Sequence, residues 1–152
     1  MLRQRAAKWV LIERNKMKSK GLPRGLANNN PLNIRKNSDV FQGEVVPSKD
    51  TAFKQFSTMA YGYRAAFRIL YNYYHKYSLN TIEKMIGRWA PPEDKNNTAA
   101  YVKVVCSKTG IPADWEIEFD KGTMTAIAAA MCKVENGREA VMSDVIDGWN
   151  LL

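Results

Sequence analysis

The chain has 152 residues, of which 45% are hydrophobic and 25% are charged, as is usual for a globular protein. This length suits one domain with a single core, and the composition excludes a disordered, collagen-like or disulfide-framework chain. No apolar run approaches the roughly 20 residues of a membrane span. The basic N-terminus lacks the apolar segment of a signal peptide, so we expect the protein to reach its place of action by another route.

The net charge of +8 is concentrated at the N-terminus. Residues 1–25 hold eight basic side chains and one acidic one, whereas residues 26–152 hold basic and acidic side chains in nearly equal number. Such a basic arm can bind phosphate backbones or an acidic polymer such as a cell wall, or simply stay solvated. Because the excess charge is confined to the arm, we do not expect nucleic acid to be the main partner.

Hydrophobic periodicity and turn residues predict a mainly helical α+β protein. We expect a basic helical arm over 1–23 and one domain over 24–152. A helix is predicted over 5–19, turn geometry over the asparagine-rich 24–35, and a small hairpin or irregular sheet within 32–56. The remaining helices are predicted over the following ranges: 59–77, 81–89, about 98–108, 123–136, and a last one that Ser143 caps and that reaches 149.

Several kinds of chemistry have no support in the sequence. Cys106 and Cys132 lie in apolar helical stretches without metal-ligand spacing, and His75 has no evident catalytic partner. The chain contains neither a glycine-rich phosphate loop nor a dinucleotide-binding motif. We therefore expect no metal and no organic cofactor. Carboxylate-based hydrolase or lyase chemistry, or binding without chemistry, remains.

Glu135 is the acidic residue whose position is most unusual. At about 100° per residue it falls near the middle of the apolar face of the 123–136 helix, whereas Lys133 and Asn136 are expected to point elsewhere. Apolar surroundings and the nearby helix C-terminus both raise a carboxyl pKa. A carboxyl that is protonated near neutral pH suits a general acid. The alternative is a glutamate that reaches solvent or an ion pair at a frayed helix end.

Two other acids compete with Glu135. Glu13 lies four residues after Trp9 in the N-terminal helix, and Glu44 lies on the predicted hairpin within Q-G-E-V-V. Either is an alternative for the acid, and Glu44 can also assist the reaction as a second carboxylate. The remaining acids stand in polar or loop contexts, where we expect them to be solvated.

The segments R-G-L-A-N-N-N-P-L-N-I-R, R-W-A-P-P-E, N-N-T-A-A-Y-V-K-V-V and V-E-N-G together resemble a family of phage and prophage proteins. Members of that family are described as structural or lysozyme-like proteins. The resemblance covers residues 24–149 and leaves residues 1–23 outside. It implies a lysozyme-like domain and a phage origin.

Individual motifs suggest roles. A-M-C-K-V-E-N-G is similar to the helix end that carries the catalytic glutamate of lytic transglycosylases, which implies Glu135. N-N-T-A-A-Y-V-K-V-V is similar to the segment of those enzymes whose tyrosine lines the cleft, which implies Tyr101. N-N-N-P-L-N-I is similar to a turn beside the active site of glucosaminidase-type domains and implies substrate contacts from three asparagines: Asn29, Asn30 and Asn33.

The order of these motifs differs from that of the family. Its members have the glutamate first, then the turn, then the tyrosine, whereas here the glutamate comes last. This is a cyclic rotation of the same order and implies a circularly permuted domain. Glu13 preserves the linear order, but we prefer Glu135, because E-N-G matches better and Glu13 lies outside the resemblance.

The implied activity is cleavage of the β-1,4 bond between N-acetylmuramic acid and N-acetylglucosamine in peptidoglycan. Glu135 acts as general acid and then as base, and Glu44 joins the asparagines and Tyr101 in holding substrate. If one carboxyl catalyses the reaction, the implied enzyme is a lytic transglycosylase. If a second carboxylate takes part, the implied enzyme is a hydrolytic muramidase. We expect glycan strands and virion proteins as partners, in the phage virion or the host periplasm and cell wall. The competing interpretations are a non-catalytic structural or wall-binding phage protein and a basic nucleic-acid-binding protein.

Overall fold

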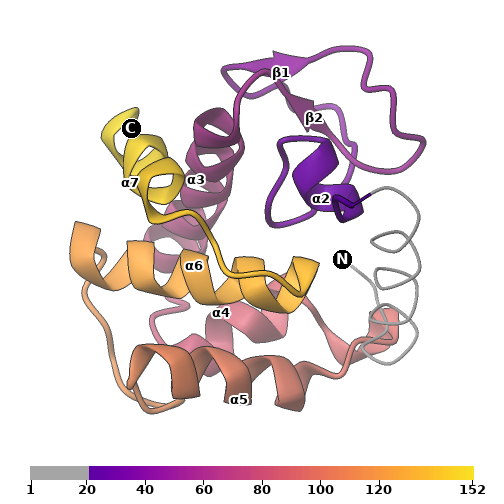
Figure 1. Ribbon diagram of the computed structural model, residues 1–152. Helices are drawn as coiled ribbons and strands as arrows, with labels where there is room; N and C mark the ends of the chain where they lie inside the picture. The colour runs from indigo at the N-terminus through magenta and orange to yellow at the C-terminus, as the bar shows by residue number, and fades with distance from the viewer. Residues whose placement is uncertain (1–20) are drawn as a thin grey trace.

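The computed structural model describes residues 21–152, which form six α-helices, one 3₁₀ helix and a two-stranded sheet (Figure 1). The described chain is mainly helical with a small β patch, which confirms the α+β prediction. The predicted helix over 5–19 and the competing acid Glu13 lie outside the described residues.

The N-terminal part holds the short helix α2 (Arg24–Ala27) and the sheet. Strand β1 (Glu44–Val45) pairs antiparallel with β2 (Gln55–Phe56), and an isolated bridge joins Arg35 to Phe53. The predicted hairpin or irregular sheet is therefore present, but in a minimal form. The asparagine-rich turn is also present, and its Asn29 and Asn33 adopt positive φ angles of 52° and 54°, as asparagine tolerates well. The helix α2 was not predicted.

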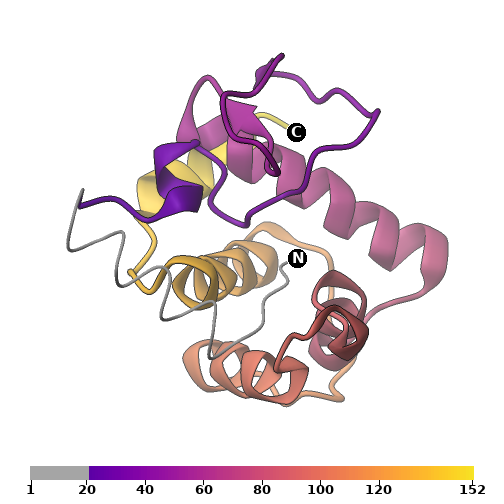
Figure 2. The ribbon, with the colours of Figure 1, turned by 90° about the vertical axis from the view of Figure 1, so that its right-hand side faces the viewer.

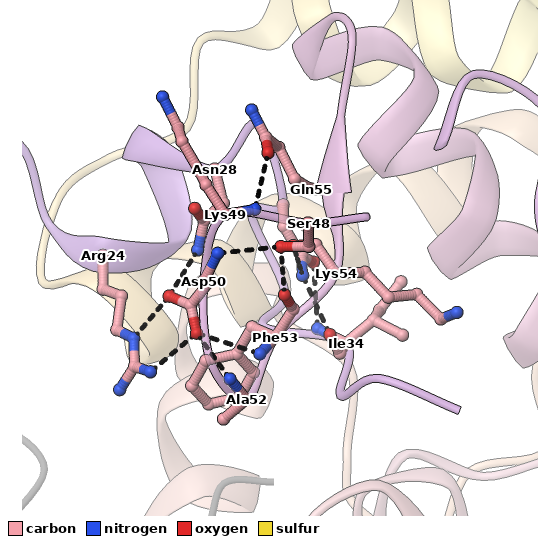
Figure 3. Close-up of polar contacts among 11 residues, drawn as sticks. Arg24, Asn28, Ile34, Ser48, Lys49, Asp50, Ala52, Phe53, Lys54 and Gln55 are labelled. Carbon is pink, nitrogen blue, oxygen red and sulfur yellow. Dashed lines mark hydrogen bonds and ion pairs between the residues drawn. The ribbon is translucent and has the colours of Figure 1, made fainter. Parts of the chain in front are cut away.

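Asp50 fastens the loop between the strands to α2 (Figure 3). Its carboxylate accepts hydrogen bonds from both Nε and Nη2 of Arg24 at 2.7 Å, and from Nδ2 of Asn28 at 3.0 Å. The backbone N–H groups of Ala52 and Phe53 donate to the same carboxylate. These donors hold the pKa of Asp50 far below its usual range, although partial burial opposes them. The loop and α2 therefore form one rigid support for the turn between them.

The rest of the chain is helical. The helices are α3 (Met59–Tyr77), α4 (Ile82–Trp89), the 3₁₀ helix η1 (Pro92–Asp94), α5 (Thr98–Thr109), α6 (Lys121–Asn136) and α7 (Met142–Asn150). The side chains of Thr58, Thr81 and Asn97 cap the N-termini of α3, α4 and α5, respectively. Such caps satisfy backbone N–H groups that lack a partner in the helix. The predictions over 59–77, 81–89 and 98–108 are therefore confirmed within one or two residues.

Two helix starts differ from the prediction. Helix α6 begins at Lys121, two residues early, because the Asp120 side chain caps it by accepting from the Thr123 N–H at 2.8 Å. The predicted cap at Ser143 is wrong. Helix α7 begins at Met142 with Val141 in the cap position and no side-chain cap, which places Ser143 inside the first turn.

Helix α6 is central to the packing. It contacts α5 on one side and α7 on another (Figure 1), while α3 packs along α7. The turned view shows α2 and the β patch across α6 from α4 and α5 (Figure 2). The apolar core runs through these contacts and includes the following fully buried residues: Leu32, Phe67, Leu70, Ile86, Met124 and Met131. None of the helices in the described part is long and apolar enough to span a membrane.

Candidate functional site

Glu135 lies in the last turn of α6 and is only 1% exposed. Gly137 ends the helix with a φ angle of 73°, a conformation that favours glycine. The predicted apolar face is present: its first four members are buried and the last is half-buried, namely Met124, Ile127, Ala128, Met131 and Val134. The placement of Glu135 on the buried face of this helix is therefore confirmed.

Two distant segments donate hydrogen bonds to the Glu135 carboxyl. Asn33 Nδ2, from the asparagine-rich turn, donates to Oε1 at 3.0 Å. The Tyr101 hydroxyl, from the start of α5, donates to Oε2 at 2.9 Å. The turn, the tyrosine and the glutamate that the three motifs singled out are thus brought together by the fold.

Burial raises the pKa of Glu135 to about 7. The hydrogen bonds from Asn33 and Tyr101 oppose this shift, because they stabilise the charged form, but desolvation outweighs them. Burial, and next the charge of Glu135, raise the pKa of Tyr101 well above its ordinary value. Near neutral pH, Tyr101 therefore remains a proton donor, while Glu135 exchanges between its acid and its carboxylate.

Trp89 belongs to both the core and the site. It ends α4, is 8% exposed, and its indole Nε1 is buried without a hydrogen bond in the described structure. The indole N–H nevertheless lies close enough to Glu135 to help lower the pKa of that carboxyl. A third donor group therefore faces the carboxyl, at longer range than the two hydrogen-bonded donors.

Asn136 ties α6 to the asparagine-rich turn, so the prediction that it points elsewhere is wrong. It is fully buried, and its Nδ2 donates to the backbone oxygens of Pro31 at 2.7 Å and Cys132 at 3.1 Å. This bond to Pro31 holds the end of the helix against the turn that carries Asn33. Sequence reasoning missed Asn136 as a site residue; the available signal was its place directly after Glu135 in the E-N-G motif.

Gly25 allows α2 to approach these asparagines. A Cβ at this position would lie 2.6 Å from Asn136 Oδ1, 2.7 Å from Asn33 Oδ1 and 2.9 Å from the Asn30 backbone oxygen. Contacts this short force the neighbours to move, so a side chain at position 25 would disturb the asparagine that holds Glu135.

The other two asparagines of the turn hold backbone groups. Asn30 is fully buried, and its amide donates to the oxygens of Ile34 and Lys54 and accepts from the Ile34 N–H, each at 2.9 Å. Asn29 Nδ2 donates to the Phe56 oxygen at 3.1 Å. Of the three, only Asn33 contacts Glu135. The expected substrate contacts of Asn29 and Asn30 remain predictions.

Glu44 belongs to a buried ion pair of the β patch. Lys54 Nζ, whose side chain is fully buried, lies 3.0 and 3.2 Å from its two carboxylate oxygens and also donates to the Asp39 oxygen at 2.7 Å. The Phe41 N–H donates to the same carboxylate. These contacts account for the position of Glu44 without any substrate, so its expected part in binding or catalysis also remains a prediction.

The thiols and potential metal ligands form no centre in the described chain. Cys106 and Cys132 are free thiols, and the latter is buried in the core. Among residues 21–152, no group of three or more His, Cys, Asp and Glu side chains is placed to hold a metal ion.

Fold and site together define a mainly helical protein with a buried carboxyl held between a turn and a helix. No family model matches the chain. It is 43% identical over 126 residues to Protein P5 of Pseudoalteromonas phage PM2, a match that covers 81% of this chain and 77% of that protein. The chain belongs to the family of this Protein P5. The phage part of the resemblance is thereby supported, while the lysozyme-like part remains a prediction.

Proposed function

We propose that this phage-related protein cleaves peptidoglycan at the β-1,4 bond between N-acetylmuramic acid and N-acetylglucosamine. The observation that carries the proposal is the state of Glu135, a buried carboxyl with a pKa of about 7 that accepts hydrogen bonds from Asn33 and Tyr101. A carboxyl in this state suits a general acid at neutral pH.

The chemistry requires a proton donor that becomes a stable carboxylate. The glycosidic oxygen takes the proton of Glu135 as the C1–O bond breaks and an oxocarbenium-like state develops. Asn33 and Tyr101 then stabilise the carboxylate that is left, because both donate to it. Each carboxyl oxygen accepts more than one hydrogen bond, so these two donors leave acceptor sites for the proton that is transferred.

A single carboxyl is sufficient for the route that we favour. The Glu135 carboxylate takes the proton of the muramyl 6-hydroxyl, whose oxygen attacks C1 and closes a 1,6-anhydro ring. The products are an anhydro-muramyl end and a free N-acetylglucosamine end, as in a lytic transglycosylase. Lysozyme-type hydrolysis needs a second carboxylate to position water, and Glu44 is neutralised by Lys54.

The motif order supports a circularly permuted lysozyme-like domain. In this chain the turn, the tyrosine and the glutamate occur in rotated order, yet Asn33, Tyr101 and Glu135 meet at one carboxyl. The basic arm over 1–23 suits attraction to an anionic cell wall. Together these features favour action on the host wall by a protein delivered with the virion or made for lysis.

The competing proposal is a non-catalytic virion or wall-binding protein of the same fold. One observation favours it: Glu135 is only 1% exposed. A glycan reaches a carboxyl this well covered only if the side chains above it move apart. In a purely structural role, Glu135 would instead serve as a buried junction between the turn, α5 and α6.

The deciding experiment is lysis of purified cell walls, followed by turbidity, with the wild type, Glu135→Gln and a control, Glu139→Gln. Glu139 follows the end of α6, its side chain is 64% exposed, and its carboxylate pairs with Lys108 of α5 and Lys133 of α6. We expect Glu135→Gln to lose about 10²–10⁴-fold in rate with an unchanged circular dichroism spectrum, and Glu139→Gln to remain active.

The products and the negative outcomes are equally informative. Mass spectrometry that finds anhydro-muramyl ends supports the single-carboxyl route, whereas reducing muramyl ends indicate hydrolysis. Full lysis by Glu135→Gln rejects the assignment. Binding of the wild type to sacculi without any lysis favours the non-catalytic alternative.

A further inference from the structure

Arg35 is fixed beside the candidate site by the β patch. It follows Asn33, whose amide contacts Glu135, by two residues. Its backbone is bridged to Phe53, and the next residue, Lys36, donates its N–H to the Ala52 oxygen at 2.9 Å. The backbone of Arg35, from which its side chain extends, is therefore held in place relative to Glu135.

The guanidinium of Arg35 is oriented by an aromatic ring and forms no ion pair with a carboxylate of residues 21–152. Its Cζ lies 5.1 Å from the centre of the Phe53 ring, and the Cζ of Arg24 lies 4.7 Å from the centre of the same ring. Asp50 binds Arg24 through two hydrogen bonds, whereas Arg35 forms no ion pair with any carboxylate of the described residues. Arg35 is also exposed, so an anion from outside can reach it.

The charge of Arg35 acts on both sides of the site. It interacts electrostatically with Asp94 in η1 and, more weakly, with Arg24 and with Glu135 at the end of α6. Partial burial, the largest effect, lowers the pKa of Arg35. A partly desolvated cation that forms no close ion pair with the described carboxylates is suited to bind an anion. The planar guanidinium matches a carboxylate through two parallel hydrogen bonds.

We propose that Arg35 binds a carboxylate carried by the muramyl unit of the glycan and so places the scissile bond at Glu135. This inference rests on the proposed function. Two sources present the same chemistry: the lactyl group of the sugar, when it bears no peptide, and the peptide attached to that group. In either case Arg35 makes the protein prefer the acidic wall glycan to a neutral N-acetylglucosamine polymer.

The test compares three forms of one substrate. These are intact sacculi, glycan stripped of its peptides by an amidase, and sacculi whose carboxylates are blocked as methylamides with a carbodiimide. The variants are Arg35→Ala, Arg35→Lys and the control Arg68→Ala. Arg68 is likewise an exposed arginine near an aromatic ring, 5.6 Å from the centre of Tyr71, but lies on α3.

We expect Arg35→Ala to raise KM about 10- to 100-fold on the substrate form that carries the recognised carboxylate, as the loss of a hydrogen bond to a charged group predicts. That form is intact sacculi for the peptide and stripped glycan for the lactyl group. On blocked sacculi it should match the wild type, whose own KM rises because the carboxylate is gone. Arg35→Lys should recover part of the loss, and Arg68→Ala should behave as wild type. An effect on intact sacculi that disappears on stripped glycan identifies the peptide carboxylates, because the lactyl carboxyl of a muramyl unit that bears a peptide is an uncharged amide. An effect confined to stripped glycan identifies the lactyl carboxylate.

Two failures are distinguishable. If Arg35→Ala leaves KM unchanged on both intact sacculi and stripped glycan, or raises it equally on intact and blocked sacculi, the assignment of Arg35 is overturned. If the wild type cleaves none of the substrates, the proposed enzymatic function fails instead. Arg35 is then still tested by co-sedimentation, in which the wild type must bind intact sacculi or stripped glycan more tightly than blocked sacculi, and Arg35→Ala must lose that difference.

Discussion

Glu135 should make the protein less stable as pH rises through neutrality. Its pKa is about 7 in the folded protein against an ordinary value of 4.5, so the folded state binds the proton more tightly than the unfolded state. The resulting stabilisation is complete below pH 4.5, declines as pH rises through about 7, and is absent above that. A shift of this size corresponds to roughly 3 kcal/mol in the free energy of unfolding, at 1.36 kcal/mol per pKa unit.

Glu135→Gln isolates this contribution, because glutamine has the same shape and does not titrate. Its carbonyl oxygen can accept from Asn33, and its NH₂ can donate to the Tyr101 oxygen once that hydroxyl rotates. We therefore expect the variant to fold. Relative to the variant, the wild type should lose about 3 kcal/mol of stability between pH 4 and pH 8.

Urea unfolding at half-unit pH intervals, with linear extrapolation to water, measures both proteins. Subtracting one curve from the other cancels every other titrating group. A difference that stays constant across this range would refute the raised pKa and remove the main support for a general acid. Glu139→Gln is a control in which the pH dependence of stability has the opposite sign. The pKa of the exposed Glu139 is lowered, mainly by Lys108 and to a smaller extent by Lys133.

Three further predictions concern the surroundings of the carboxyl. Tyr101→Phe should raise the pKa of Glu135 by about one unit or more, since it removes a hydrogen bond to the charged form; carbon-13 NMR of the carboxyl measures this, and an unchanged pKa contradicts the contact. Gly25→Ala should cost about 1–3 kcal/mol in urea unfolding, because its Cβ overlaps three oxygens. Gly87→Ala, where a Cβ meets nothing within 4 Å, should be neutral or stabilising, and equal effects of the two substitutions would argue against the overlap. Lys54→Met should cost about 3–5 kcal/mol, because it leaves a buried carboxylate on β1 without its partner; replacing that carboxylate as well should recover much of the loss, and additive costs would contradict the ion pair.

The sequence predicted the helices because their signals are local. Apolar spacing of three and four residues marked the helix over 59–77, and the structure places the side chains of Thr81 and Asn97 as caps at the starts of the next two α-helices. Two predicted helix starts were wrong for local reasons. The Asp120 side chain caps α6 two residues earlier than predicted, and α7 begins at Met142, so that Ser143 lies within its first turn. The short strands were harder to predict, because their pairing joins residues about ten positions apart.

The site was predictable only in part, for the same reason. Periodicity placed Glu135 on a buried face, because that face follows from the geometry of its own helix. Which side chains meet the carboxyl depends on how segments more than thirty residues apart pack against one another. The packing therefore decided that Asn33 contacts Glu135 while Asn29 and Asn30 hold backbone groups, and that Lys54 neutralises Glu44. The local sequence determines which side chains of a helix are buried. The residues that contact a buried side chain are determined only by the packing of segments that are distant in the sequence.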